Sequence, residues 1–154
     1  MNHRINRAAP FPAVHCFELN FLITLNDILL SRWSDDAYLQ RVIDKDLDPL
    51  WSTVHRLVVD AGIRLVFRRE RDEDVLECDD IQNLMYILSC RMAVMHPRNV
   101  LASLREMGIS KCMLHSTFSK RKTSPHLSTV LSMVQHLGYT AVFITEFSKF
   151  TVRN

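Results

Sequence analysis

The sequence predicts a mainly α-helical fold in which two tandem helical bundles each end in a short β-strand or hairpin. The first observation is a repeat, because STVHRLVVDAGIRLVF at 52–67 returns as STVLSMVQHLGYTAVF at 128–143. At a constant offset of 76 residues, 49–67 and 125–143 share eight identities in nineteen positions, where chance gives about one. The second observation is apolar side chains at helical spacing, and the third is a short β-like run after each repeated glycine. We therefore expect a duplicated unit of roughly 75 residues.

The duplication divides the chain into a flexible basic tail at 1–12, a first repeat at 13–78 and a second repeat at 79–154. In a chain of 154 residues that is 47% hydrophobic, two small repeats that share an interface fit best. The net charge of +2 hides an asymmetry: 11–80 contains 15 Asp and Glu against 8 Lys and Arg, whereas 81–154 contains 2 against 9. A polyanion would therefore be attracted to the basic second repeat and repelled by the acidic first repeat.

The second repeat should begin with two helices. An Asp-Asp pair at 79–80 stands where an N-cap belongs, and apolar residues follow it at helical spacing. His96 ends this helix, because Pro97 follows and the residue before a proline avoids the helical region. A short helix at 97–106 then ends near Gly108, since glycine accepts the left-handed conformation after a helix most easily.

Two more helices should complete the second repeat, with a polar loop between them. Ser110 caps the first of these helices, and the loop SKRKTS occupies 119–124. Pro125 opens the second helix, which carries a stripe of buried apolar residues and runs to His136. Gly138 stops it.

β-like runs follow each repeated glycine, at 63–68 and 74–77 in the first repeat and at 139–144 and 150–153 in the second. Charged or polar turns could close each pair of runs into a hairpin. Because an isolated two-stranded hairpin is marginally stable, we expect the strands of the two repeats to pack against each other or against a partner. A fused pair of repeats would bury these strand edges about a pseudo-twofold axis without a second chain.

The second repeat contains, in order, a helix, the turn MGIS at 107–110, a second helix, a polar loop, PHLSTVLSMVQHLG at 125–138 and a strand. This order resembles the Xre-type helix-turn-helix domain, and most closely the branch found in the host-inhibition-of-growth antitoxins. The resemblance covers about 45 residues of the second repeat. It implies two tandem helix-turn-helix-like helical bundles, of which the second binds DNA. The matching residues are Gly108, Ile109, Ser110, Leu114, Phe118, Pro125, Leu127, Thr129, Val130, Leu131, Leu137 and Gly138.

The helix that begins at Ser110 is the expected recognition helix. Ile109, Leu114 and Phe118 attach it to the bundle, so its other side chains face out. Small hydroxyl side chains allow close approach to the major groove, Lys and His can donate to guanine, and basic residues beyond the helix can contact phosphates. The alternative is a solvated basic helix and loop on a protein-binding module. The candidate DNA-binding residues are Ser110, Lys111, Cys112, His115, Ser116, Ser119, Lys120, Arg121 and Lys122.

The first repeat departs from this pattern at its surface. Arg32 stands at the position of the turn glycine, and carboxylates at the outward positions would oppose phosphate binding. We expect a degenerate acidic helix-turn-helix-like repeat that serves as a built-in dimer-like partner or docks a protein. Its outward positions are Ser34, Asp35, Asp36 and Gln40, followed by Asp44, Asp46 and Asp48 in the loop.

The remaining side chains give no sign of catalysis, a metal or a cofactor. The seven histidines are scattered, and no glycine-rich phosphate loop occurs. His55 and His136 are expected at the surface or as core residues, and Trp33 and Trp51 in the core. No apolar run approaches the roughly 18 residues needed to span a bilayer. The cysteines lack CxxC pairing and are expected as reduced thiols in a cytoplasm; they are Cys16, Cys78, Cys90 and Cys112.

The sequence therefore predicts a cytoplasmic, sequence-specific DNA-binding transcriptional regulator of bacterial or mobile-element origin. Its expected partners are double-stranded DNA, a protein at the acidic first repeat, and a second copy if it forms a homodimer. The alternative is a protein-binding antiactivator, antitoxin or phage inhibitor that uses the helix-turn-helix scaffold without DNA.

Overall fold

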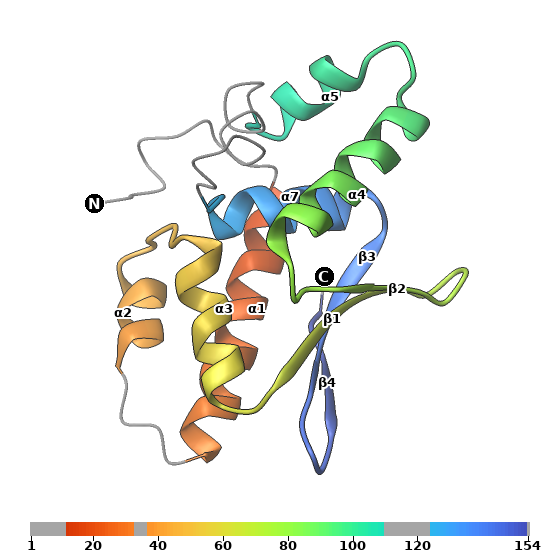
Figure 1. Cartoon of the computed structure of the whole chain (residues 1–154). Helices are drawn as coiled ribbons and strands as arrows, with labels where there is room; N and C mark the ends of the chain where they lie inside the picture. The colour runs from red at the N-terminus through yellow and green to blue at the C-terminus, as the bar shows by residue number, and fades with distance from the viewer. Residues whose placement is uncertain (1–11, 33–36, 110–123, 154) are drawn as a thin grey trace.

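Helices make up more than half of the described chain, which comprises residues 12–32, 37–109 and 124–153 of the computed structural model (Figure 1). A small antiparallel sheet accompanies them. The mainly helical architecture agrees with the sequence-based expectation. The helices are α1 (Pro12–Ser31), α2 (Tyr38–Asp44), α3 (Trp51–Asp60), α4 (Ile81–Met95), α5 (Val100–Glu106) and α7 (Leu127–His136).

The sheet joins the two repeats. Its four strands are in the order β2-β1-β3-β4, so β1 of the first repeat pairs with β3 of the second. This confirms the expectation that the strands after Gly62 and Gly138 pack against each other. The second strand of each hairpin lies at an edge of the sheet. The strands are β1 (Arg64–Arg69), β2 (Asp74–Glu77), β3 (Tyr139–Ile144) and β4 (Lys149–Thr151).

The register of β1 and β3 has local twofold symmetry. Val66 lies opposite Val142, and these residues are 76 positions apart, which is the offset of the repeat. A second antiparallel bridge joins Leu50 to His126, which are again equivalent positions. A pseudo-twofold axis therefore passes between Val66 and Val142 at the sheet, and between Leu50 and His126 at the other bridge.

The apolar core lies between the helices and one face of the sheet. The ring centroids of Phe21 on α1 and Phe143 on β3 lie 5.0 Å apart, and those of Trp51 on α3 and Phe67 on β1 lie 6.0 Å apart. Helix α7 packs against α1, and residues 127–134 of α7 are all buried. One cluster of buried side chains contains residues of both repeats, so the repeats share a core.

Side-chain caps and glycine backbone conformations mark the ends of three helices. Asp80 caps α4, because its side chain accepts hydrogen bonds from the backbone N–H groups of Gln82 at 3.0 Å and Asn83 at 3.2 Å. Gly108 and Gly138 adopt φ angles of 78° and 88°, which lie in the left-handed region that glycine tolerates. These capping and stop signals were predicted correctly.

Some boundaries differ from the prediction. Helix α5 begins at Val100 rather than at 97, because 97–99 form a turn. Helix α7 begins two residues after Pro125, whose carbonyl is engaged by the other repeat. Helix α1 includes Pro12, which the sequence assigned to the tail, and proline is well tolerated in a first helical turn. The bounds of β2 and β3 are as predicted, whereas β1 and β4 are shifted by one or two residues.

Candidate nucleic-acid interface

The predicted DNA-binding surface lies outside the described residues, between 109 and 124, but both of its ends are described. At the upstream end, Gly108 makes a left-handed turn and Ile109 is buried. The backbone N–H of Ile109 donates to the carbonyl of Leu104 over 2.9 Å, which fixes the turn to α5. The candidate residues that fall in this segment are Ser110, Lys111, Cys112, His115, Ser116, Ser119, Lys120, Arg121 and Lys122.

At the downstream end, the two repeats exchange backbone hydrogen bonds. The N–H of Trp51 donates to the carbonyl of Pro125 over 2.8 Å, and the N–H of Leu127 donates to the carbonyl of Pro49, also over 2.8 Å. Trp51 and Leu127 are equivalent in the repeat, as are Pro49 and Pro125. The end of the basic loop is therefore hydrogen-bonded to the first repeat at Trp51. The equivalent segment of the first repeat, at Pro49, is hydrogen-bonded to the second repeat in the same way.

Each repeat also caps one helix of the other repeat, α3 or α7. Asp48 accepts hydrogen bonds from the N–H of Ser128 at 3.2 Å and from its hydroxyl at 2.6 Å, at the first turn of α7. Ser124, which is equivalent to Asp48, accepts from the N–H of Ser52 at 3.0 Å, at the first turn of α3. Side chains that accept from first-turn N–H groups stabilise a helix, so each repeat stabilises the start of a helix in the other.

Asp48 corrects one expectation about the acidic surface. The sequence placed it with the exposed loop carboxylates, but only 3% of its surface is exposed, because its side chain turns inward to cap α7. Of the other outward positions, Gln40, Asp44 and Asp46 are exposed, whereas Ser34, Asp35 and Asp36 lie outside the described residues. Of the remaining carboxylates that the sequence assigned to the loop, Asp46 lies there, whereas Asp44 is the last residue of α2.

Arg32 occupies the turn position of the first repeat and reaches across to the second. Its guanidinium donates to the carbonyl of Ala61 over 2.9 Å and to the carboxylate of Glu146 over 2.6 Å. That contact holds the pKa of Glu146 below its ordinary value. Arg32 therefore acts as an inter-repeat contact in place of the glycine turn.

A polar cluster connects the β1–β2 hairpin, β3 and α4. Asp74 accepts hydrogen bonds from the hydroxyl of Tyr139 and the guanidinium of Arg91. The guanidinium of Arg69 lies over the ring of Tyr139, 4.8 Å from its centroid. Burial, and then the hydrogen bond to Asp74, raise the pKa of Tyr139 to about 12, whereas the hydrogen bonds from Tyr139 and Arg91 lower the pKa of Asp74. At neutral pH, the neutral phenol of Tyr139 therefore donates a hydrogen bond to the carboxylate of Asp74. This contact links the two repeats.

Two histidines that are distant in sequence meet at the ends of two helices. His96 caps the end of α4, and its Nε2 lies 2.8 Å from Nε2 of His136, the last residue of α7. Burial, and then the neighbouring His96, lower the pKa of His136. His55, on α3, stacks on the buried ring of Trp51, and burial lowers its pKa too. The description of the seven histidines as scattered is therefore wrong for this pair.

The described residues do not assemble a metal centre. Among them, no group of three or more His, Cys, Asp or Glu side chains is arranged to hold a metal ion. The described cysteines, Cys16, Cys78 and Cys90, are free thiols, and Cys112 lies outside the described residues. None of the described helices is both long enough and apolar enough to span a membrane.

Histidine protonation should destabilise the protein in mild acid. The pKa values of His136 and His55 are lowered in the folded state, whereas in the unfolded chain they return to about 6.5. Below that pH the unfolded state binds protons that the folded state does not. The free energy of unfolding should therefore fall as the pH drops through about 6.5, and level off below the folded pKa values. Urea denaturation at a series of pH values measures this dependence.

His136→Gln tests whether protonation of His136 contributes to this pH dependence. In this variant, the free energy of unfolding should fall less as the pH drops. His96→Gln should reduce the pH dependence by a smaller amount, since burial is the larger cause of the low pKa of His136. A pH dependence in His136→Gln equal to that of the parent chain would contradict this contribution.

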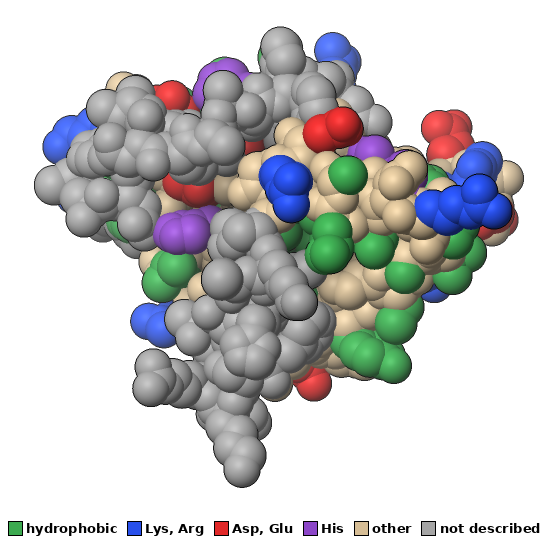
Figure 2. Space-filling model, turned by 90° about the horizontal axis from the view of Figure 1, so that it is seen from above, with side chains coloured by type: hydrophobic (Ala, Val, Ile, Leu, Met, Phe, Trp, Pro, Cys, Tyr) green, Lys and Arg blue, Asp and Glu red, His purple; other side chains and the backbone are tan. Residues whose placement is uncertain are grey.

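On the face seen in Figure 2, acidic and basic side chains of the described residues are interspersed, and they do not form a patch of one sign. The basic cluster that the sequence predicts, Lys120, Arg121 and Lys122, lies between 109 and 124, outside the described residues. No protein family, curated protein or solved structure matches this chain.

Proposed function

We propose that the protein is a sequence-specific DNA-binding transcriptional regulator, in which the second repeat reads the major groove and the first repeat is its built-in dimer-like partner. The observation that carries this proposal is the reciprocal exchange between the repeats, in which Asp48 caps α7 and Ser124 caps α3. The pairing of β1 with β3 about Val66 and Val142 supports it.

This arrangement matches what a helix-turn-helix protein needs. Such proteins commonly bind as dimers in which a twofold axis relates two recognition helices. Here one chain supplies both halves, so a second chain is not required to bury β1, β3 or the start of α7. The bridge between Leu50 and His126 lies on the pseudo-twofold axis, and the basic loop ends directly beside it. We therefore assign the DNA-facing side to the Leu50–His126 end of the axis.

The charge of the second repeat supports contact with phosphates. No Asp or Glu occurs between 107 and 145, whereas the loop contains Lys120, Arg121 and Lys122. We assign phosphate contacts to these three residues and contacts with base edges to Lys111 and His115. Because the equivalent region of the first repeat is acidic, the preferred DNA site should be a single half-site rather than a palindrome. A cytoplasmic location is part of the proposal.

Replacing Lys120, Arg121 and Lys122 together by alanine should weaken DNA binding almost equally on all sequences. Each lost phosphate contact should lower the slope of log affinity against log salt by about 0.9, because fewer counterions are released. A gel shift or fluorescence titration of the purified protein against its own upstream DNA, at several salt concentrations, measures this slope. Arg64, Arg68 and Lys149 provide a matched control, because they are three basic residues on the strands of the sheet. A slope that is unchanged in the first variant, or reduced equally in the control, would remove the loop from the interface.

A protein-binding role is the second candidate, and the exposed Asp44 and Asp46 favour it. Replacing both by lysine separates the two functions. If the repeat is only a structural partner of a DNA reader, the change should slightly raise non-specific DNA affinity. If the acidic surface docks a protein, the change should abolish binding of a partner that the parent chain captures.

A further inference from the structure

Helix α4 is largely apolar on every side, but the rest of the chain covers only part of it. Its main helix contacts are with α7 and α5 (Figure 1). On the side away from the core, 62% of Tyr86 and 82% of Val94 is exposed, and Cys90 between them is exposed too. A helix that is apolar all round is normally buried all round. The buried side chains of α4 are Leu84, Met85, Leu88 and Met92.

The exposed side of the helix, which we call the α4 face, carries no charge. Arg91 is the only charged residue of α4, and its guanidinium is bound to Asp74 and to the hydroxyl of Tyr139. A nucleic acid needs cations to pair with its phosphates, and a charged protein surface needs opposite charges. Neither would find them here. The α4 face consists of Tyr86, Cys90, Ala93 and Val94.

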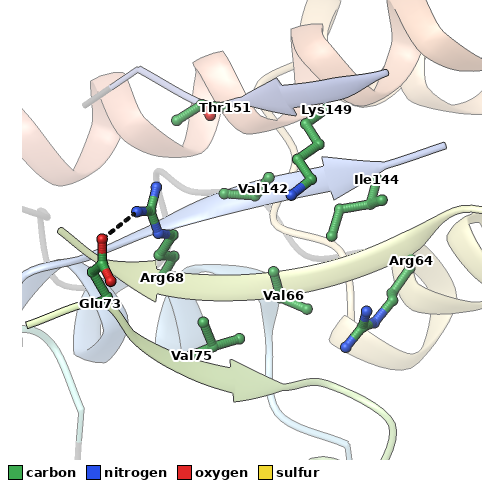
Figure 3. A pocket seen from close by; sticks show the side chains of 9 residues that line it. All are labelled: Arg64, Val66, Arg68, Glu73, Val75, Val142, Ile144, Lys149 and Thr151. Atoms are coloured by element: carbon green, nitrogen blue, oxygen red, sulfur yellow. Dashed lines mark ion pairs between the residues drawn. The ribbon is translucent and has the colours of Figure 1, made fainter. Parts of the chain in front are cut away.

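The outer face of the sheet is less accessible than the α4 face. No described helix lines the groove that Figure 3 shows on it. At its centre, however, Val66 and Val142 are only 4% and 6% exposed. Arg68 on its border lies 3.7 Å from Glu73. Neighbouring side chains therefore close this face, whereas the side chains of the α4 face are open to a partner.

The two ends of the α4 face differ in shape. At one end, Tyr86 projects into solvent. At the other end, Val94 borders a hollow of about 400 Å³. Tyr86 and Val94 are each four residues from Cys90, which is about 6 Å along the helix. The face therefore carries a projection and a hollow at equal distances on either side of Cys90. The hollow is lined by Arg69, Arg71, Arg91, Val94, Met95 and Leu137.

We infer that the α4 face is an interface between two copies of this chain, whose α4 helices pack antiparallel about a twofold axis at Cys90. In a twofold contact each copy presents the same surface, so a projection on one must meet a hollow on the other. The ring of Tyr86 in each copy would enter the hollow beside Val94 of the other copy, where arginine side chains favour an aromatic ring. The small side chains of Cys90 and Ala93 would let the helices approach closely.

The spacing of the face suits such a helix pair. Residues 86, 90 and 94 form an i, i+4, i+8 row, and rows of this kind interdigitate in the commonest class of helix packing. Contact along one helix of about 22 Å is small, so we expect a dimer of micromolar or weaker affinity. Each copy is a whole chain with its own two repeats, and the inference does not rest on DNA binding.

Other occupants match the face less completely. A small molecule could fill the hollow, but it would leave Tyr86 and Cys90 uncovered. A different protein would have to supply both an aromatic side chain and a hollow, at the right separation. A second copy supplies both by symmetry, and it brings no charge against the face.

Salt gives this interface a recognisable signature. The face is uncharged, whereas 81–154 contains 2 Asp and Glu against 9 Lys and Arg, so two copies repel each other at long range. Added salt screens that repulsion. The dimer should therefore tighten as the salt concentration rises, whereas DNA binding should weaken.

Sedimentation equilibrium of the full chain, under reducing conditions and at low and high salt, measures the dimer. Tyr86→Lys should weaken it more than about tenfold, because the variant removes the ring and brings an ammonium group to the arginines of the hollow. Cys90→Lys, which sets two ammonium groups against each other at the axis, should have the same effect. Leu30→Lys is the matched control, since Leu30 is 58% exposed on α1, and it should leave the dimer unchanged.

Thiol cross-linking tests the antiparallel geometry. In a Cys16→Ser, Cys112→Ser background, Cys90 is the exposed thiol and Cys78 is buried. A short bis-maleimide should join two chains through Cys90. Moving the thiol to the exposed position 83, as Asn83→Cys with Cys90→Ser, should abolish the cross-link. The two copies of residue 83 would lie about 20 Å apart along the helices.

Four results would overturn the inference. The first is a chain that stays monomeric at millimolar concentration in high salt. The second is a dimer that Tyr86→Lys and Cys90→Lys leave intact, or that Leu30→Lys weakens equally. The third is association that weakens as salt rises, which would assign the contact to charged groups. The fourth is equal cross-linking from position 83. Loss of DNA binding with the dimer retained would contradict only the proposed DNA-binding function.

Discussion

Asp48→Ala is expected to lower the free energy of unfolding by about 2–3 kcal/mol, which is large for a substitution in a loop. The carboxylate is buried and accepts from both the N–H and the hydroxyl of Ser128. Alanine would remove the cap of α7 and leave two buried donors without these acceptors, and an unsatisfied buried donor is costly. Urea denaturation of the variant and the parent chain at neutral pH measures the loss.

Two matched variants separate the cap from other effects at this site. Asp48→Asn keeps one oxygen acceptor of similar shape and should recover part of the lost stability. Ser124→Ala removes the equivalent cap on α3, where a single neutral hydroxyl accepts, and should cost about 1 kcal/mol. A loss in Asp48→Ala no larger than that in Ser124→Ala would show that Asp48 contributes no more than an ordinary cap.

Deletion of residues 1–78 is expected to prevent the second repeat from folding as a stable monomer. The deletion removes β1, α1 and the Asp48 cap together, and it exposes residues such as Phe143, which is fully buried in the intact chain. Each large apolar side chain that becomes exposed costs about 1.5–3 kcal/mol, and the net stability of a domain is only about 5–15 kcal/mol. The fragment should therefore aggregate, or dimerise to replace the lost partner.

Sedimentation and amide resonance dispersion distinguish these outcomes. A dimer whose β3 strands pair with each other would show that the fused first repeat replaces a second chain. Co-expression with residues 1–78 as a separate chain provides the control, because it should restore a soluble complex. A monomeric 79–154 fragment with well-dispersed resonances would contradict the role of the first repeat as a built-in partner.

The organisation of the fold could be predicted because its signals are local. Helix ends depend on backbone conformation and capping within a few residues, so Asp80, Gly108 and Gly138 marked them correctly. The repeat further predicted that the strands after Gly62 and Gly138 would pair. Two equivalent strands that pair with each other satisfy the backbone hydrogen-bonding groups along their edges.

The candidate site was predicted less completely because its residues act through distant partners. Asp48 and Asp46 are chemically identical in the sequence, yet Asp48 turns inward to Ser128, which is 80 residues away, whereas Asp46 is exposed. No spacing rule brings His96 to His136, or places Arg32 against Glu146. The assignment of Lys120, Arg121 and Lys122 to DNA contact stays a prediction, since these residues lie outside the described chain.

The sequence by itself determined the duplication, the approximate positions of the helices of the second repeat and of the four strands, and the opposite charges of the two repeats. These properties follow from residue type and short-range spacing, which the chain carries before it folds. Only the tertiary structure decided which surfaces of the repeats face each other, that each repeat caps a helix in the other, and that one face of the sheet is uncovered. Those outcomes depend on contacts between residues about 76 positions apart, whose geometry is set when the two halves dock about Val66 and Val142.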